Sequence, residues 1–435
     1  MNARTTALSA LIACRKQGAW ADGVLKEYII RDRLDKRDAA LASRLCYGVL
    51  QNRMLLDHYI QLCLSGPMKK LPPVVLDILR LGMYQLLFLD KVPVSAAVNE
   101  AVEQGKKYAN HRAAGLINGV LRRAAREKDS LPAPDSLAIR YSHPQALVDL
   151  LADSVGQERL EALLASHNTT PTTVIQSNPL VASAAEVHAA LEQAGVILQP
   201  HPWLPDAWFA SGTGNLEYLP MFREGGFFVQ DPAARLAVMA ADVKPGMHVL
   251  DGCAAPGGKS FASAIAMGNQ GSIISCDIHA HKMDLLAKGA QRLQISIITP
   301  VLRDGREFEP KWDKSMDVVL ADVPCSGLGV IRKKPDIRYK DLSGLEHLPE
   351  IQGAILDNLA RYVRPGGVLV YSTCTILRRE NEDVVRAFLE HHNDFQPEGF
   401  PLPEALGGNC SGQITLLPSV HDTDGFFICK LRREQ

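Results

Sequence analysis

Two cysteines stand where an α/β protein places its reactive groups. Cys374 closes the stretch Val-Tyr-Ser-Thr-Cys, and Cys325 lies upstream in Asp-Val-Pro-Cys-Ser. Each follows a short apolar run typical of a strand, at residues 318–321 and 367–370. Open α/β sheets bind ligands at the carboxyl ends of their strands. The pair therefore indicates thiol nucleophilic catalysis rather than packing.

A glycine-rich turn precedes both cysteines. Residues 251–260 read Asp-Gly-Cys-Ala-Ala-Pro-Gly-Gly-Lys-Ser, and the last three fit the end of a phosphate loop. Cys253 occupies the position where that motif requires its first glycine, and the dinucleotide motif G-x-G-x-x-G is absent. A turn of small residues still lets a ligand approach the backbone closely. The turn therefore predicts a ligand site of another kind.

Acidic residues follow the next two predicted strands. Asp277 and Asp304 would lie along one edge of the sheet, where a carboxylate can bind ribose hydroxyls. Two carboxylates suit a neutral or cationic nucleoside better than a nucleotide, and S-adenosylmethionine has these properties. For either aspartate alone, a turn or helix cap would be an equally good interpretation.

Methylation of cytosine at C5 would use this set of groups. A thiolate adds to C6, an acidic group holds the N3/N4 edge, and a second base removes the C5 proton. Cys374, Asp322 and Cys325 could supply all three, although spacing alone leaves the two cysteines interchangeable. A lone buried cysteine is more commonly inert.

Helices must make up the front of the chain. Residues 1–128 carry apolar side chains at helical spacing, and residues 1–130 hold 21 Lys+Arg against 12 Asp+Glu. The remainder holds 26 against 36, so a net charge of −1 conceals a basic front and an acidic remainder. A basic module suggests a polyanionic partner, and a solvated helix surface is the alternative. We expect helices at residues 5–14, 38–52, 54–63, 74–89, 95–108 and 113–126.

The rest divides into three parts. Residues 129–143 look like a linker, and residues 144–226 like a small α+β subdomain. Its helices are expected at residues 146–152, 157–166 and 184–194 and its strands at residues 172–176 and 196–199. From residue 227 to 435, strands alternate with helices, which predicts a mostly parallel, doubly wound sheet. The strands are expected at residues 248–252, 272–277, 298–303, 317–321, 367–371 and 425–431.

Composition limits the remaining possibilities. No run reaches the roughly 18 apolar residues that a membrane span needs. The nine cysteines are scattered and never spaced C-x-x-C, which argues against disulfides and zinc. We expect no metal, a monomer, and a reducing cytoplasmic location.

Two families share these motifs. Pro-Val-Ser-Ala-Ala-Val-Asn-Glu-Ala-Val at residues 93–102 and Leu-Ile-Asn-Gly-Val-Leu at 116–121 resemble the NusB fold, which implies an all-α RNA-binding domain. Residues 228–431 resemble the RsmB/NOP family of RNA cytosine-5 methyltransferases through the glycine-rich turn, Asp-x-Pro-Cys-Ser and Ser-Thr-Cys. The whole chain is therefore expected to be multidomain: NusB-like, small α+β, and Rossmann-like methyltransferase.

The resemblance implies specific roles. Cys374 would be the nucleophile, Cys325 would assist release of the product, and Asp322 would lie between cofactor and cytosine. The cofactor S-adenosylmethionine would be bound by Cys253, Ala254, Ala255, Pro256, Gly257, Gly258, Lys259, Asp277, Asp304 and Asp322. RNA would meet Arg122, Arg123, Arg126, Arg332, Lys333, Lys334 and Arg338, although the first three could simply cap a helix.

One departure affects the RNA contacts. The family often has Arg-x-Asn before the catalytic domain, whereas this chain has Gln176-Ser177-Asn178, which removes a positive charge. The expected substrate is 16S rRNA, either naked or in an early assembly intermediate of the small subunit. A tRNA cytosine-5 methyltransferase and a non-catalytic NusB-like antitermination factor are the alternatives.

Overall fold

The computed structural model describes residues 2–435, which form two compact units. The first contains residues up to Thr169 together with Ile331–Lys340, and the second contains Thr170–Val330 and Asp341–Gln435. This division differs from the expected boundaries at 128 and 144. The stretch expected to be a linker contains a short helix, and the next two helices also belong to the first unit.

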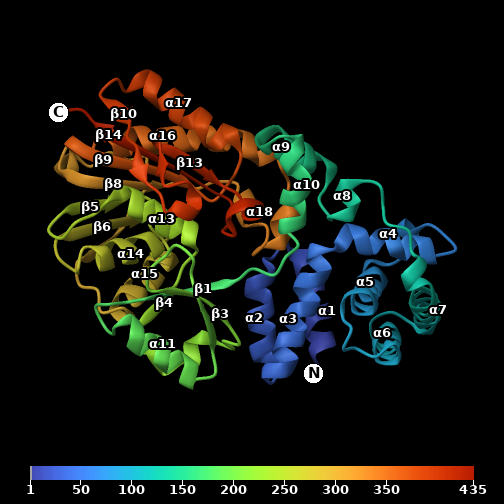
Figure 1. Cartoon of the computed structure of the whole chain (residues 1–435). Coiled ribbons are helices and arrows are strands. Elements are labelled where there is room, and N and C mark those ends of the chain that lie inside the picture. The colour runs from blue at the N-terminus through green and yellow to red at the C-terminus, as the bar shows by residue number, and fades with distance from the viewer. Residues whose placement is uncertain (1) are drawn as a thin grey trace. The chain divides into compact units, whose positions relative to one another are not determined.

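Helices alone build the first unit (blue to green in Figure 1). The central helix α5 packs against α1, α3, α4, α6 and α7, because apolar residues cover most of its circumference. The six expected helices of residues 1–128 are confirmed as α1 and α3 to α7, whereas α2 and the short α8 were not predicted. The helices are α1 (Ala3–Gln17), α2 (Ala21–Arg31), α3 (Lys36–Gln51), α4 (Arg53–Cys63), α5 (Pro73–Phe88), α6 (Val94–Tyr108), α7 (His111–Glu127), α8 (Leu137–Arg140), α9 (Gln145–Val155) and α10 (Gln157–Ser166).

A small antiparallel sheet opens the second unit. Its strand order is β2-β3-β1-β4, and α11 (Ala184–Gln193) packs on it through Val187 and Leu191. Two of its strands, β3 and β4, and the short helix α12 (Pro220–Arg223) were not predicted. The strands are β1 (Thr173–Ser177), β2 (Ile197–Pro200), β3 (Ala207–Ser211) and β4 (Phe227–Val229).

The main sheet has eight strands and confirms the doubly wound prediction. Its order is β10-β14-β9-β8-β5-β6-β7, with β13 paired to β14; β5 to β9 run parallel and β14 is antiparallel to β9. The strands are β5 (His248–Asp251), β6 (Ser272–Asp277), β7 (Ile298–Leu302), β8 (Met316–Asp322), β9 (Val363–Thr373), β10 (Phe395–Pro397), β13 (Gln413–Leu416) and β14 (Phe426–Arg433); β11 (Phe400–Pro401) and β12 (Asn409–Cys410) form a separate ribbon.

Both faces of this sheet are covered because its strands are apolar at consecutive positions. Val318 and Leu320 of β8 join one core with α13, α14 and α15, whereas Val319 and Ala321 join the other with α16 and α17. This two-sided burial is typical of parallel sheets. The helices are α13 (Pro232–Ala241), α14 (Gly258–Ala266), α15 (Ala280–Arg292), α16 (Leu348–Ala360), α17 (Glu382–His391) and the short α18 (Pro418–His421). No helix within residues 2–435 is long and apolar enough to cross a membrane.

Candidate active site

The two cysteines meet at the carboxyl end of the main sheet. Strands β8 and β9 are parallel neighbours, with Asp322 paired to Ser372 at their ends. Cys325 and Cys374 follow these ends, and their Sγ atoms lie 3.2 Å apart. Both are free thiols. The sheet therefore brings the two predicted residues to one point.

The loop that carries Cys374 is held on both sides. The Cys374 carbonyl accepts a hydrogen bond from the Gly329 amide at 3.0 Å. The Thr373 hydroxyl donates to Asn381 Oδ1 at 2.6 Å, and Asn381 Nδ2 donates to the Thr375 carbonyl at 3.1 Å. Asn381 is fully buried, so these bonds fix the backbone without competition from water.

A buried carboxylate organises the loop of Cys325. Glu380 Oε2 accepts the Ser326 amide at 2.9 Å and Gln352 Nε2 at 3.0 Å. Gln352 Nε2 also donates to the Pro324 carbonyl at 3.0 Å. Glu380 thus holds both sides of Cys325, a positioning role that sequence reasoning did not assign to it.

The surroundings make the two thiols unequal. The pKa of Cys374 is lowered by a hydrogen bond from Cys325 and by the Lys259 ammonium, against burial and Asp322. The pKa of Cys325 is raised well above its usual value by that same hydrogen bond, by burial and by Glu380. Cys374 is therefore the thiol that ionises first.

Lys259 is fixed beside this pair. Its side chain is 8% exposed, and its ammonium forms an ion pair of 2.6 Å with Asp322 Oδ2. Asp322 Oδ1 accepts a hydrogen bond of 2.9 Å from the Ser372 hydroxyl. One oxygen of this half-buried carboxylate thus neutralises Lys259, and the other is held by the neighbouring strand.

The glycine-rich turn links β5 to α14. Gly257 has φ +112°, a left-handed conformation that suits glycine, and an added Cβ would lie 2.4 Å from the Phe261 ring. Asp251 is fully buried and accepts the Ser260 hydroxyl at 2.7 Å. Burial raises the pKa of Asp251 to about 7. This carboxyl therefore stabilises the turn from the protein interior and is not available to a ligand.

A cavity of ≈ 370 Å³ opens at the carboxyl ends of β5, β6 and β7. Asp277 is 8% exposed there, with Oδ1 accepting the His279 amide at 2.9 Å. Asp304 accepts two charge-assisted bonds from Arg306, which lower the pKa of this carboxyl. The lining residues are Gly252, Cys253, Ala255, Asp277, Ile278, His279, Lys282, Arg303, Asp304, Gly305, Arg306, Asp322, Pro324, Ile351 and Ile355.

The cavity contains half of the residues expected at the cofactor. Cys253, Ala255, Asp277, Asp304 and Asp322 line it, whereas Ala254, Pro256, Gly257, Gly258 and Lys259 do not. The last five shape the turn or, for Lys259, face Asp322. Sequence reasoning missed the apolar wall of Ile278, Ile351 and Ile355. Of these three, only Ile278 could have been predicted from the sequence, because it directly follows Asp277.

The chain matches three family models that together span most of its length. Residues 238–432 match the model described as 16S rRNA methyltransferase RsmB/F, residues 1–126 the NusB family, and residues 143–211 a ferredoxin-like domain of RsmF/B-like methyltransferases. A Bacillus subtilis protein named "Probable ribosomal RNA small subunit methyltransferase B" is 37% identical over 99% of this chain and 98% of its own. The chain belongs to the RsmB/F methyltransferase family.

Further comparisons agree over the full length. Ribosomal RNA small subunit methyltransferase B of Vibrio cholerae is 33% identical over 100% of this chain and 98% of its own. The crystal structure of the protein PH0851 superposes with a TM-score of 0.80 at 26% identity, covering 99% of this chain and 98% of that one. The protein is thus a 16S rRNA methyltransferase of the RsmB/F family, with a NusB region, a ferredoxin-like middle domain and a methyltransferase domain.

The expected RNA-contacting arginines of α7 lie on its surface. Arg122, Arg123 and Arg126 are exposed. Arg122 donates to Asn118 Oδ1 at 2.8 Å, and Arg123 pairs with Glu127 at 3.1 Å. These are exchangeable surface contacts, so all three guanidinium groups remain accessible to a phosphate.

The basic segment after Cys325 differs from the expectation. Lys333 is half-buried and Lys334 exposed, but Arg332 and Arg338 are 5% and 1% exposed. Arg338 cannot contact RNA in this structure, because its guanidinium is enclosed by oxygen acceptors of the first unit. It donates to the carbonyls of Gln51 (2.9 Å), Tyr141 (3.2 Å), Ser142 (3.3 Å) and His167 (3.2 Å) and to Asn168 Oδ1 (2.9 Å).

The departure at Gln176 also has a structural explanation. Gln176 is 5% exposed and donates to the Gln230 carbonyl at 3.3 Å. Asn178 is fully buried and donates to the carbonyls of Gly225 and Leu293, both at 2.9 Å. This stretch therefore ties the small sheet to the main one.

Proposed function

We propose that the protein methylates C5 of a cytosine in 16S rRNA through a covalent bond between Cys374 Sγ and cytosine C6. The observation that carries the proposal is the pair of thiols 3.2 Å apart, of which one has a lowered pKa and the other a raised pKa. Cytosine-5 methylation needs one thiolate to attack and a second group to assist release, and the two cysteines differ in this sense.

The cavity fits S-adenosylmethionine as the methyl donor. Its volume lies within the range of small-molecule sites, about 300–1,000 Å³. Asp277 stands where ribose hydroxyls are bound, the isoleucine wall suits an adenine ring, and Asp322 suits a cationic centre. A Cβ at Gly305 would lie 3.3 to 3.6 Å from its neighbours, so the wall there is tightly packed. When bound, the cofactor supplies the methyl group that C5 takes up.

The residues of the chain carry out the remaining steps. Cys374, as thiolate, donates an electron pair to C6. The electron pair of the C5–C6 double bond is then available at C5, which becomes nucleophilic. We assign to Asp322 the binding of the N3/N4 edge of the base. After methylation, the C5 proton is removed, its electron pair restores the C5–C6 double bond, and Cys374 leaves as thiolate.

Cys325 is suited to assist that last step. The largest cause of its raised pKa is the hydrogen bond to the neighbouring sulfur. Once the Cys374 sulfur is covalently bound to C6, it carries no negative charge, and this cause disappears. Cys325 can then lose its proton to solvent and take up the proton from C5, directly or through one water.

Labelled methyl transfer from S-adenosylmethionine tests the proposal. The substrates are 16S rRNA, small-subunit assembly intermediates and total tRNA, and digestion locates 5-methylcytidine. We expect transfer by the wild type, none by Cys374→Ala, and a protein–RNA adduct on a denaturing gel with Cys325→Ala. Cys410→Ala, which alters a half-buried free cysteine on β12, is the matched control.

Each other outcome has a clear meaning. An adduct with Cys374→Ala instead of Cys325→Ala would exchange the roles of the cysteines. Methylation at another atom of the base would refute the C5 proposal, and transfer to tRNA alone would replace the substrate.

A further inference from the structure

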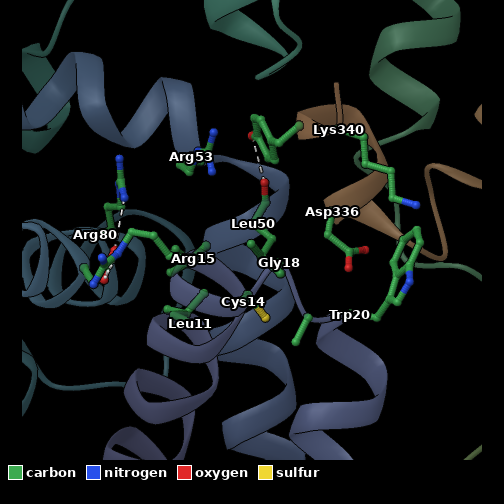
Figure 2. Close-up of a pocket in the computed structure, with 14 residues that line it drawn as sticks. Leu11, Cys14, Arg15, Gly18, Trp20, Leu50, Arg53, Arg80, Asp336 and Lys340 are labelled. Atoms are coloured by element: carbon green, nitrogen blue, oxygen red, sulfur yellow. Dashed lines mark hydrogen bonds and ion pairs between the residues drawn. The ribbon is translucent and has the colours of Figure 1, made fainter. Parts of the chain in front are cut away.

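The first unit contains a second cavity of ≈ 370 Å³ that the methyltransfer reaction does not use. It lies between α1, α3, the start of α4, α5 and the segment Ile331–Lys340, which belongs to the same unit (Figure 2). Four cationic side chains and two carboxylates line it. The lining residues are Leu11, Cys14, Arg15, Gly18, Ala19, Trp20, Val49, Leu50, Arg53, Asp77, Arg80, Asp336, Tyr339 and Lys340.

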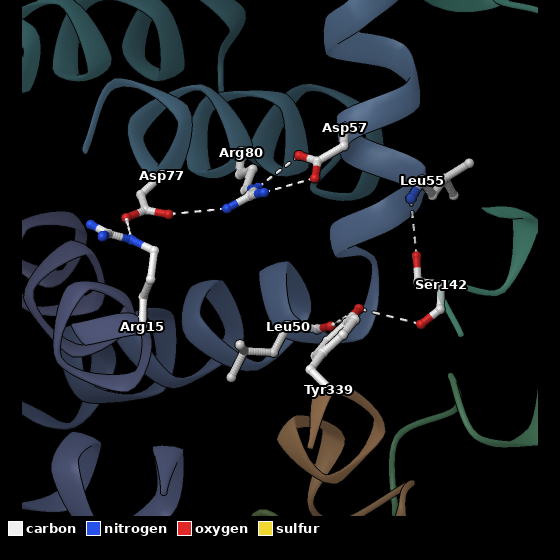
Figure 3. Close-up of polar contacts among 8 residues, drawn as sticks. All are labelled: Arg15, Leu50, Leu55, Asp57, Asp77, Arg80, Ser142 and Tyr339. Atoms are coloured by element: carbon white, nitrogen blue, oxygen red, sulfur yellow. Dashed lines mark hydrogen bonds and ion pairs between the residues drawn. The ribbon is translucent and has the colours of Figure 1, made fainter. Parts of the chain in front are cut away.

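Two of the four cations are already paired. Arg80 makes two bonds of 2.7 Å to Asp57 and one of 3.1 Å to Asp77, and Arg15 pairs with the other oxygen of Asp77 at 2.9 Å (Figure 3). This chain of charges fixes one wall of the cavity. Both oxygens of Asp77 accept bonds in this chain, one from Arg15 and one from Arg80.

Arg53 is one of the two cations that lie outside this chain of ion pairs. Its guanidinium lies 3.6 Å from the centroid of the Tyr339 ring, and no ion pair among residues 2–435 includes it. The Tyr339 hydroxyl donates to the carbonyls of Leu50 (2.9 Å) and Ser142 (3.3 Å), so the ring beneath the guanidinium is fixed. Burial lowers the pKa of Arg53, as expected for a cation withdrawn from water without a counter-ion.

The opposite rim joins an aromatic ring to further cations. Trp20 is 40% exposed, which is unusual for this side chain. Lys340 Nζ lies 3.2 Å from its ring centroid, and Lys334 Nζ lies 5.6 Å from it. Asp336 accepts the Ala21 amide at the start of α2 at 3.0 Å, so part of its charge is used in capping that helix.

We propose that this cavity binds one nucleotide of single-stranded RNA, with the phosphate held by Arg53 and Lys340 and the base against Trp20. An unpaired guanidinium is suited to bidentate phosphate binding, and an exposed indole next to cations is the usual platform for an unstacked base. The proposal rests on the rRNA substrate of the proposed function but not on its cysteine chemistry.

The cavity is not a property of a NusB region alone. The NusB match ends at residue 126, whereas Asp336, Tyr339 and Lys340 come from a segment far along the chain. That segment follows Cys325 closely in sequence. The methyltransferase thus completes its own RNA site with residues that adjoin its catalytic loop.

Fluorescence anisotropy of a labelled, unstructured single-stranded RNA tests the proposal on the full chain without cofactor. Arg53→Gln/Lys340→Gln removes the two cations. Lys69→Gln/Lys70→Gln removes two exposed lysines of the same unit outside the cavity and is the matched control. Trp20→Ala removes the platform. Arg53→Lys keeps the positive charge but removes the guanidinium, which can bind a phosphate through two N–H groups at once.

The expected results are specific. Arg53→Gln/Lys340→Gln should weaken binding. It should also make the negative slope of log K against log salt shallower by about 0.7, the value for one phosphate contact on a single strand. Trp20→Ala should weaken binding about 5- to 150-fold with the slope unchanged. Arg53→Lys should retain most of the slope. The control should change the affinity less than the cavity variants do, and the slope less than Arg53→Gln/Lys340→Gln does.

Two outcomes would overturn the proposal. Equal losses in the control would mean that the whole basic surface attracts RNA, and unchanged binding in Trp20→Ala and Lys340→Gln would mean that the cavity takes no nucleotide. Lys340 and Trp20 are surface residues, so these variants should fold even if Arg53→Gln does not. The assay contains no cofactor and measures no methyl transfer, so its result is independent of the cysteine mechanism.

Discussion

Gly329→Ala should disable catalysis while leaving cofactor binding intact. The Gly329 amide donates to the Cys374 carbonyl at 3.0 Å, and its own carbonyl accepts the Gly425 amide at 2.8 Å. A Cβ at position 329 would lie 1.8 Å from the Gly425 oxygen and 2.8 Å from the Cys374 oxygen. The φ of Gly329 is not positive, so backbone strain does not contribute, and the effect of the substitution comes from the steric clash alone.

The size of the effect follows from the distances. Non-bonded atoms do not approach a Cβ closer than 3.0 Å, so the backbone must separate by at least 1.2 Å, the difference from 1.8 Å. Displacement of a reacting group by about 1 Å can cost about 10²-fold in rate. Overpacking of this kind costs about 1–3 kcal/mol of stability, which should leave the fold intact.

The assay is single-turnover methyl transfer to 16S rRNA, with cofactor affinity measured by calorimetry. Gly425→Ala should give an intermediate loss, because its Cβ would lie 2.7 Å from Gly329 Cα and from an Ile376 methyl group that can move. Gly353→Ala is the control, since nothing lies within 4 Å of its Cβ on α16. If Gly329→Ala keeps more than a third of wild-type activity, this contact does not position Cys374.

Four further predictions concern single side chains. Lys259→Met should raise the pKa of Cys374 and shift the acidic limb of the pH profile of kcat/KM upward by about one unit or more; an unchanged limb would show that Lys259 does not act on the thiol. Asp277→Asn should weaken S-adenosylmethionine binding by about tenfold or more in calorimetry, and unaltered affinity would remove this carboxylate from the ribose site. Arg338→Met should destabilise the first unit by about 3 kcal/mol in denaturant unfolding, because it removes the guanidinium donor from five oxygen acceptors, and an unchanged free energy of unfolding would contradict this. The pKa of Asp251 is about 7 in the folded protein and 3.8 in the unfolded chain, so its contribution to the free energy of unfolding is complete below pH 4 and is lost as pH rises toward 7. Asp251→Asn should remove that part of the pH dependence of stability. An identical pH dependence in the variant would contradict this prediction.

The sequence predicted the elements whose pattern is local. Strands β5, β6, β8 and β9 contribute residues to the cores on both faces and read as apolar runs, and residues at their carboxyl ends could be placed at one edge without further information. The meeting of Cys325 and Cys374 follows from that rule. Helix α2 was missed because Trp20, which precedes it, offers no capping side chain; the cap comes from Asp336.

The failures share a cause, which is contact between distant segments. Nothing local to Arg338 shows that its partners lie near residues 51, 141 and 168, so a run of basic residues was interpreted as an RNA-binding surface. Similarly, the isoleucines of α16 reach the cofactor cavity only through the packing of that helix on the sheet. Pattern predicts which residues lie on a sheet edge, but not which distant side chains cover it.

Hydrogen bonding and charge, rather than spacing, distinguish the two cysteines under the proposed chemistry. Both follow parallel strands, both are half-buried, and they touch each other, so geometry alone would permit either to attack. The hydrogen bond from Cys325 is the largest cause of the lowered pKa of Cys374 and of the raised pKa of Cys325; Lys259 adds to the first effect and Glu380 to the second. Lys259 belongs to the cofactor turn and pairs with Asp322, so the arrangement that positions the methyl donor also favours the thiolate form of the attacking residue. Glu380 holds the loop of Cys325 and adds to the raised pKa of this thiol. The hydrogen bond to Cys374, which is the largest cause of that raised pKa, is the one that would be lost when the Cys374 sulfur binds the base.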